Sequence, residues 1–252
     1  CPNRAAHVYA WCMLSRAAAS ARKIITISQY SKKEIVCRLG VRPDKVVVIY
    51  HGVSPLYRVE SDGERLEGIR KKYSIGGPYI LYVGNHQPRK NIKRLFDAFS
   101  MLRRAQDYTL VLTGKIDPRR QSLYGEAERD GLKGRVLFVG EVPEIDLPGL
   151  YSGAALFVFP SLSEGFGLPP LEAMACGAPI VSSAAMSIPE VVGDAGILID
   201  ASDTGQLCEA MDRVLSSRML REDLIAKGLK RAAQFSWDEA TKKTLRVYEQ
   251  VG

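Results

Sequence analysis

From residue 79 onward, short apolar stretches alternate with longer stretches whose apolar residues recur every three or four positions. The short stretches are typical of strands buried on both faces, and the longer ones of amphipathic helices. Predicted strands cover residues 79–84, 109–114, 136–140, 155–159, 179–182 and 196–199. Predicted helices cover residues 91–104, 119–130, 145–151, 168–176, 206–216, 219–234 and 237–250. This alternation predicts an α/β fold with a doubly wound parallel sheet.

The first 75 residues carry a shorter version of the same pattern. Helices are predicted at 6–21 and 31–39, and strands at 24–28 and 45–50. A polar stretch that contains Gly63, Gly76 and Gly77 follows. These pieces are too few for an independent domain, so we interpret residues 1–75 as the end of one domain with its linker. Residues 76–234 then form a second domain.

A glycine loop joins the predicted strand 155–159 to the next helix, from Ser163 to Glu172 (SEGFGLPPLE). Its glycines let the backbone approach a ligand closely, and Pro169 and Pro170 suit the first turn of a helix, whose free N–H groups attract anions. The loop therefore predicts a site for a phosphate-bearing ligand. A plainer alternative is that Glu172 complements the helix dipole, worth about 0.3 to 1 kcal/mol, while Glu164 is a solvated charge.

A second loop, from Gly84 to Asn91 (GNHQPRKN), follows the predicted strand 79–84. Arg89 offers a bidentate fork and Lys90 a point charge, two complementary ways to bind phosphate. Taken alone, both are equally consistent with surface residues of a loop. A dinucleotide site for hydride transfer is disfavoured, because Gly84 is not followed by glycines at the Gly-x-Gly-x-x-Gly spacing.

Together these segments resemble a known family. Glu-x7-Glu with Gly-Phe-Gly inside it, followed by AMACGAPIV at residues 173–181, resembles the donor-binding domain of retaining glycosyltransferases with the GT-B fold, in the family usually numbered four. The resemblance runs from about residue 21 to the end of the chain. It implies a GT-B type of fold, in which a Rossmann-like doubly wound parallel sheet accompanies the remnant of an N-terminal Rossmann-like domain. It also implies that residues 235–252 form a helix crossing back to that N-terminal domain.

The resemblance assigns roles to residues of both loops. Glu172 is expected to accept hydrogen bonds from the ribose of a nucleotide sugar, and Glu164 to face the transferred sugar. Arg89 and Lys90 are expected to stabilise the departing diphosphate, so the expected catalytic residues are Glu164, Arg89 and Lys90. Many members have arginine where this chain has Asn85. The other expected donor contacts are Gly84, Asn85, Val142 beside the base, and the backbone of Gly165, Phe166, Gly167 and Leu168. For Phe166, core packing and ligand binding both stay open.

Composition narrows the class of protein and of partner. The chain is 46% apolar and 25% charged, as in ordinary globular proteins, and its five widely spaced cysteines indicate neither a disulfide framework nor a zinc site. We therefore expect a reducing cytoplasm. Residues 1–75 hold 14 Lys or Arg against 6 Asp or Glu, whereas the remainder holds 21 against 22. This excess suits an anionic membrane or a phosphorylated acceptor, and equally suits scattered solvated charges. Nucleic acid is not expected, because no recognition motif accompanies the charge.

These observations predict a retaining glycosyltransferase that moves a hexose such as mannose from a UDP- or GDP-sugar. The expected acceptor is a glycan or lipid-linked precursor of cell-surface polysaccharide or lipopolysaccharide, used at the cytoplasmic face of the membrane. No metal or other cofactor is expected, because the chain contains no Asp-x-Asp. Two Rossmann-like halves need about 350 residues at about 100 to 200 each. We therefore expect upstream residues in the parent enzyme, and nucleotide binding without turnover by this fragment.

Three alternatives remain. The chain could be a non-catalytic nucleotide-sugar binding module. It could be an anion or membrane docking protein that uses the basic first third. A sugar epimerase or a phosphorylase with the same pattern is the third, and the phosphorylase is disfavoured because no lysine is evident for a pyridoxal group.

Overall fold

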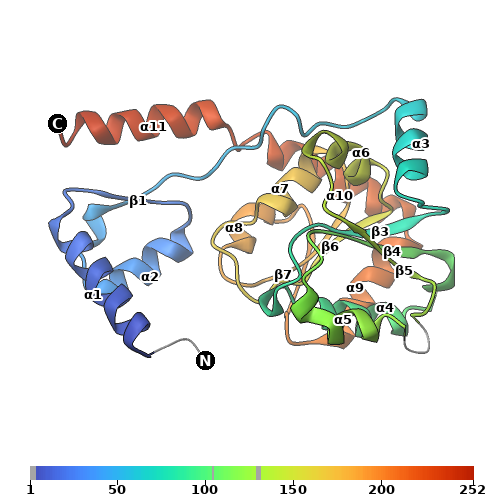
Figure 1. Cartoon of the computed structure of the whole chain (residues 1–252). Coiled ribbons are helices and arrows are strands. Elements are labelled where there is room, and N and C mark those ends of the chain that lie inside the picture. Colours follow the sequence, from blue (N-terminus) through green and yellow to red (C-terminus); the bar gives the residue numbers. More distant parts are fainter. Residues whose placement is uncertain (1–3, 104, 129–131) are drawn as a thin grey trace. The chain divides into compact units, whose positions relative to one another are not determined.

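The structure is a computed structural model, and it describes residues 4–103, 105–128 and 132–252 (Figure 1). Internal contacts divide the chain into a smaller unit, Cys1–Gly52 with Ser236–Gly252, and a larger unit, Val53–Phe235. The N-terminal boundary between the two units thus lies after Gly52, earlier than the boundary expected after residue 75. Residues 53–75 pack with the larger unit, where the Tyr57 ring lies edge-on to Tyr151, with ring centroids 6.2 Å apart.

The larger unit is built on a six-stranded sheet with the order β5-β4-β3-β6-β7-β8. Each strand pairs in parallel with its neighbours, and the central strands are buried on both faces. Starting from the central pair β3 and β6, the strands that follow β3 in sequence, β4 and β5, lie on one side. The strands that follow β6, β7 and β8, lie on the other. Ligands of open α/β sheets bind at such a switch point, beyond the carboxyl ends of the strands. The strands are β3 (Tyr79–Tyr82), β4 (Thr109–Thr113), β5 (Val136–Gly140), β6 (Leu156–Phe159), β7 (Ile180–Ser183) and β8 (Ile197–Ile199).

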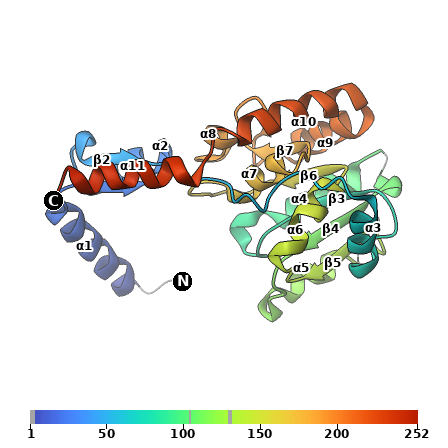
Figure 2. The ribbon, with the colours of Figure 1, turned by 90° about the horizontal axis from the view of Figure 1, so that it is seen from above.

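Helices cover both faces of this sheet, with α6 and α7 on one side and α4 and α9 on the other (Figures 1 and 2). This arrangement confirms the expected α/β class and the doubly wound sheet. The helices of the larger unit are α3 (Gly63–Lys72), α4 (Ile92–Met101), α5 (Gln121–Glu126), α6 (Leu147–Ser152), α7 (Leu168–Ala175), α8 (Ile188–Val192), α9 (Thr204–Ser216) and α10 (Arg218–Ala232). The helix ends expected at Arg104 and Asp130 lie outside the described residues.

Helices α3 and α8 were not expected from the sequence. Helix α3 has the sequence GERLEGIRKK, in which only two residues are large and apolar. It begins where the Asp62 side chain accepts hydrogen bonds from the backbone N–H groups of Glu64 and Arg65, and its Ile69 is buried. An N-cap and one buried anchor therefore suffice for a helix that hydrophobic periodicity does not reveal.

From residue 4 onward, the smaller unit contains a two-stranded parallel sheet and three α-helices. Ile49, which follows β2, packs with Ala240 and Val247 of α11. The expected C-terminal helix thus packs beside the N-terminal strands. The elements are α1 (Arg4–Ser20), β1 (Ile24–Thr26), α2 (Gln29–Leu39), β2 (Val46–Val48) and α11 (Trp237–Glu249).

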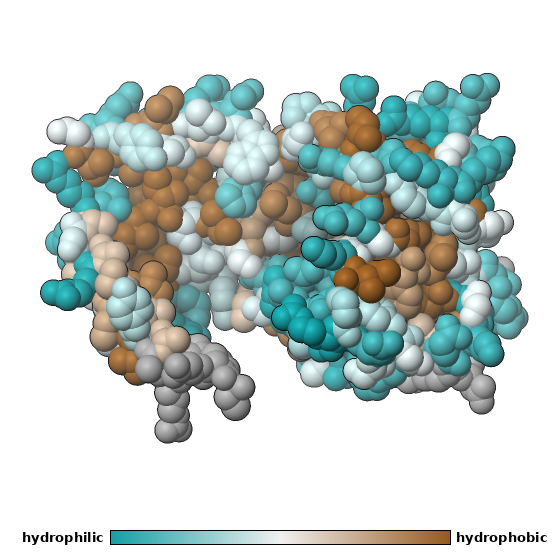
Figure 3. All heavy atoms as spheres, viewed as in Figure 1, coloured by the Kyte–Doolittle hydropathy of each residue, from teal (hydrophilic) through white to brown (hydrophobic). Residues whose placement is uncertain are grey.

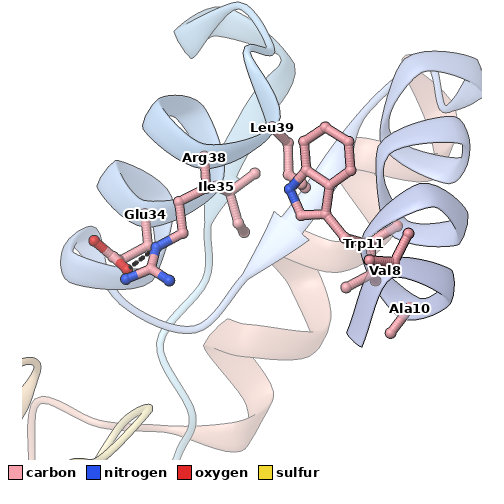
Figure 4. Close-up of a pocket in the computed structure, with 8 residues that line it drawn as sticks. Val8, Ala10, Trp11, Glu34, Ile35, Arg38 and Leu39 are labelled. Atoms are coloured by element: carbon pink, nitrogen blue, oxygen red, sulfur yellow. Dashed lines mark ion pairs between the residues drawn. The ribbon is translucent and has the colours of Figure 1, made fainter. Parts of the chain in front are cut away.

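An apolar groove lies between α1 and α2 of the smaller unit. Trp11 and Val8 project from α1 toward Ile35 and Leu39 of α2, around a volume of about 580 Å³ (Figure 4). Figure 3 shows apolar surface over the same elements. Within the described part of the chain, none of the helices has the length and apolarity needed to cross a membrane.

Candidate functional site

The loop after β3 is shaped by a close approach of two strand ends. Gly84 and Gly114 both have positive φ, and a Cβ on Gly114 would lie 2.1 Å from the carbonyl oxygen of Gly84. The Tyr82 hydroxyl donates to the Asn85 carbonyl at 2.9 Å. At the far end of the loop, the Asn91 amide donates to the Pro160 carbonyl at 3.1 Å. The loop is therefore fixed at both ends, between the carboxyl ends of β3, β4 and β6.

Three of the predicted site residues meet across the switch point. Lys90 Nζ lies 2.5 Å and Arg89 Nη1 lies 3.3 Å from the same oxygen of Glu164, Oε1. The Ser161 hydroxyl donates to that oxygen as well, at 2.6 Å. The fold thus brings together Arg89, Lys90 and Glu164, the three residues expected to be catalytic.

The two cations of this cluster have different surroundings. Lys90 is buried and its ammonium lies 4.8 Å from the centroid of the Phe159 ring, whereas the Arg89 side chain is 43% exposed. Burial lowers the pKa of Lys90, and the bond to Glu164 opposes that shift. An incoming diphosphate would compete with Glu164 for Lys90, while the partly exposed Arg89 remains accessible to it.

The glycine loop before α7 presents few N–H donors. Gly167 has φ +114° and Leu168 begins the helix, but Pro169 and Pro170 carry no N–H, and the Leu171 N–H already bonds to the Gly167 carbonyl. The first turn of α7 therefore offers fewer free N–H groups than its sequence suggested. The side chains of residues 165–168 carry no polar atoms, so this segment could bind a phosphate or a sugar only through its backbone N–H groups.

Phe166 has its side chain in the core. It is 3% exposed and packs edge-on to Phe235, with ring centroids 5.9 Å apart. The Ser187 hydroxyl lies within hydrogen-bond distance of the Glu164 and Phe166 carbonyls, at 2.9 and 3.1 Å, and so supports the loop. Of the two interpretations left open, the structure supports packing for the ring, so only the Phe166 backbone could contact a ligand.

Glu172 lies in a second polar cluster. It is half-buried and follows the first turn of α7, beyond the short range in which the helix dipole acts, so the dipole alternative loses its support. The Tyr151 hydroxyl donates to Glu172 Oε2 at 3.0 Å, and the Tyr57 hydroxyl lies 3.4 Å from Glu144 Oε1. Burial raises the pKa of Glu172 above the ordinary carboxyl value. Tyr57 also contacts Glu172, and so links it to Glu144. Glu144 comes two residues after Val142, in the loop that was expected to contact the base.

His86 is engaged entirely by the protein. It is 2% exposed, its Nε2 lies 3.2 Å from the Thr113 carbonyl, and its Nδ1 lies 3.1 Å from the Tyr124 hydroxyl. A carbonyl only accepts, so Nε2 carries the proton and Nδ1 accepts from Tyr124. Burial lowers the pKa of His86, which favours this neutral form. The His86 side chain therefore anchors the loop from Gly84 to Asn91 to β4 and α5.

Tyr151, Ser161 and Ser187 are among the contributors that were not predicted from the sequence. Each touches a predicted site residue, and all three are buried. Only Ser161 carried a usable signal, because it follows the end of strand β6 closely. Tyr151 and Ser187 come from elements whose position depends on the folded sheet.

Comparison with known proteins identifies the family. The family model described as "Glycosyl transferases group 1" matches residues 67–231, more than half of the chain. The chain belongs to this family. A second family model, "Glycosyltransferase Family 4", matches residues 2–55 of the same chain. The resemblance seen in the sequence is therefore confirmed.

Relatives and solved structures extend this result. The O-antigen chain mannosyltransferase B of Escherichia coli is 38% identical to this chain over 232 residues. The alignment covers 91% of this chain and 61% of that relative. The chain thus spans about three fifths of the relative's length. Sucrose-phosphate synthase from Thermosynechococcus elongatus has a TM-score of 0.85 at 26% identity, covering 100% of this chain and 64% of that one. The Anabaena protein HepE, solved with UDP and glucose, has a TM-score of 0.85 at 22% identity, covering 95% and 66%. These likenesses confirm the GT-B type of fold.

Proposed function

We propose that this chain is the donor-binding part of a glycosyltransferase that takes a hexose from a UDP- or GDP-sugar. The single observation that carries the proposal is the meeting of Lys90, Arg89 and Glu164 at the carboxyl ends of β3 and β6. Two cations suit a diphosphate whose negative charge grows as the glycosyl bond breaks. The carboxylate beside them suits the sugar, either by holding its hydroxyls or by stabilising the positive charge that develops on it.

In this proposal each part of the donor has its own binding group. Glu172 accepts hydrogen bonds from the ribose hydroxyls, the segment around Val142 borders the base, and the N–H groups of 165–168 contact the sugar and the phosphates. Transfer then retains configuration, with the acceptor attacking the face from which the diphosphate leaves. The leaving phosphate assists by taking the acceptor's proton. HepE, solved with UDP and glucose, supports the choice of donor class.

We also propose that the acceptor is a glycan or lipid-linked precursor of a surface polysaccharide. Support comes from the O-antigen chain mannosyltransferase B of Escherichia coli, whose name states both the product and the sugar. The excess of Lys and Arg in residues 1–75 suits a phosphorylated acceptor or an anionic membrane surface. Exposed apolar side chains on α1, among them Tyr9 and Trp11, suit the same kind of surface.

Glu172→Ala tests the donor site directly. Losing a charged hydrogen-bond acceptor costs about 1.5 to 3 kcal/mol, so the affinity for the matching nucleoside diphosphate should fall on the order of 10- to 100-fold. Titration calorimetry of the 252-residue chain with UDP, GDP and ADP provides the measurement. Unchanged affinity in the variant would reject the ribose role. No binding of any nucleotide by the unaltered chain would reject the proposed function itself.

A chelation experiment tests the proposed metal independence. With upstream residues present, sugar transfer should continue at an unchanged rate in EDTA, because Lys90 and Arg89 supply the cationic charge. The measurement is incorporation of labelled sugar into the acceptor, with and without chelator. Abolished transfer that recovers on adding a divalent cation would contradict this part of the proposal.

A further inference from the structure

Tyr151 is a buried phenol whose one polar atom is directed at Glu172. Its ring lies edge-on to Phe157 of β6, with ring centroids 5.4 Å apart, and edge-on to Tyr57. The side chain is fully buried, and burial raises the pKa of its hydroxyl well above the ordinary value. The hydroxyl therefore stays protonated and serves as a permanent donor. Its acceptor is Glu172 Oε2, at 3.0 Å.

The two tyrosines near Glu172 are not equivalent. Tyr57 is in hydrogen-bond contact with both Glu144 and Glu172, so its single proton is shared between two carboxylates. Tyr151 has Glu172 as its hydrogen-bond acceptor and is held by aromatic rings on two sides. Among the described residues, Glu172 forms no ion pair with a lysine, arginine or histidine. The phenol of Tyr151 is thus the contact that fixes the orientation of the carboxylate.

A carboxylate has about four lone-pair positions that accept hydrogen bonds, and Tyr151 takes one of them, on Oε2. Tyr57 also contacts this carboxylate, and the remaining positions are the ones that hydroxyl groups of a ligand would use. A side chain that a supporting hydrogen bond already holds in place loses less conformational entropy when the ligand binds. The affinity for the ligand is therefore higher. Negative charge on nearby Glu144 opposes ionisation of Glu172, and a neutral donor supports the ionised form without neutralising it.

We propose that Tyr151 is a positioning residue for nucleotide recognition: it orients Glu172 so that the carboxylate can accept hydrogen bonds from the ribose hydroxyls. This inference rests on the proposed function, because it takes Glu172 as the ribose-binding group. It predicts that the protein's discrimination between ribose and deoxyribose depends on a side chain that does not itself touch the nucleotide.

The test compares nucleotides that differ only in the ribose. Titration calorimetry measures binding of the preferred nucleoside diphosphate and of its 2′-deoxy and 3′-deoxy forms. The proteins are the unaltered 252-residue chain, Tyr151→Phe, Glu172→Gln and Tyr79→Phe. Tyr79 is the matched control, since it is also buried but donates to the backbone carbonyl of Leu150, at 2.7 Å. Thermal melting establishes that each variant is folded.

Tyr151→Phe should lower the affinity for the ribonucleotide by about 3- to 10-fold. Its affinity for the deoxy form lacking the bonded hydroxyl should stay unchanged, so the discrimination shrinks. Tyr79→Phe should preserve the discrimination of the unaltered chain. If Tyr151→Phe weakens both nucleotides equally, or neither, the positioning role is overturned while the donor site stands. If the unaltered chain binds no nucleotide, the proposed function itself is rejected. If Glu172→Gln keeps full discrimination between the ribose and deoxyribose forms, the ribose role of Glu172 is rejected.

The pH dependence of binding gives a second readout. Ribonucleotide affinity should fall as pH drops through the pKa of Glu172, which burial raises and the Tyr151 hydrogen bond lowers. The groups facing Glu172 are Tyr151, Tyr57, Glu144 and Cys176, and the Cys176 thiol has its pKa raised to about 12 by burial. Tyr151→Phe removes a donor, so its midpoint should move to higher pH. Should that variant not fold, 3,5-difluorotyrosine at position 151, a stronger donor, should move the midpoint lower. An unmoved midpoint in the folded protein overturns the inference.

Discussion

Replacing Lys90 by methionine is expected to lower the free energy of unfolding by up to about 3 kcal/mol, because it removes the buried partner of Glu164 and leaves that carboxylate only the partly exposed Arg89 as a cation. The Lys90 and Glu164 side chains are only 7% and 11% exposed, and their charged atoms lie 2.5 Å apart. Methionine keeps the length and apolar character of the side chain, so the loss reports on the charge. Urea denaturation at pH 7, followed by circular dichroism, measures it. The same change should weaken nucleoside diphosphate binding on the order of 10- to 100-fold.

Glu164→Gln supplies the matched control for Lys90. Glutamine keeps an oxygen that can accept from the Ser161 hydroxyl, which lies 2.6 Å from Glu164 Oε1. Combined with Lys90→Met it removes both charges, and the double variant should recover most of the lost stability, to within about 1 kcal/mol of the unaltered chain. A Lys90→Met variant as stable as the unaltered chain would show that the pair is solvated. Additive losses in the double variant would show that the two charges do not interact.

Gly114→Ala is expected to destabilise the larger unit by about 3 kcal/mol or more, through overpacking and backbone strain together. Gly114 has φ +121°, which side chains disfavour, and its Cβ would meet the Gly84 carbonyl oxygen at 2.1 Å. The obstruction is backbone, so no rotamer change relieves it. The strand ends would have to separate, which displaces the loop that carries Arg89 and Lys90. Urea denaturation gives the loss of stability, and calorimetry should show weakened nucleotide binding in the fraction that folds.

Gly68→Ala is the matched control for Gly114. Gly68 lies inside helix α3, and a Cβ there would meet nothing within 4 Å. Alanine should therefore stabilise the helix by about 0.5 to 1 kcal/mol. A Gly114→Ala variant that behaves like Gly68→Ala would mean that β3 and β4 do not approach each other as closely as the structure shows.

The strand pattern could be read from the sequence because burial on both faces leaves a simple apolar signature. Each of the six strands of the larger unit overlaps its predicted stretch. Helix α3 could not be predicted in this way, since its stability comes from the Asp62 cap and the burial of Ile69 rather than from a regular apolar stripe. The division after Gly52 was likewise hidden, because it depends on what residues 53–75 pack against.

The candidate site shows the same limit. Glu164, Glu172, Arg89 and Lys90 were singled out from two local motifs, and the resemblance to the glycosyltransferase family supplied their expected roles. Their partners were not predicted, because Lys90 and Glu164 lie 74 residues apart and meet only when β3 and β6 are neighbours. Tyr151 was hidden for a further reason: a tyrosine in an apolar segment has the same sequence signature whether its hydroxyl donates to the carboxylate of Glu172 or to a backbone carbonyl.

A crystal structure of the chain with a UDP- or GDP-hexose tests the central claim most directly. The account predicts diphosphate oxygens within hydrogen-bond distance of Lys90 Nζ and the Arg89 guanidinium, with the ribose hydroxyls on Glu172. Lys90 should then have exchanged part of its contact with Glu164 for the phosphate. A nucleotide bound away from the carboxyl ends of β3 and β6, or no bound nucleotide at saturating concentration, would contradict the account.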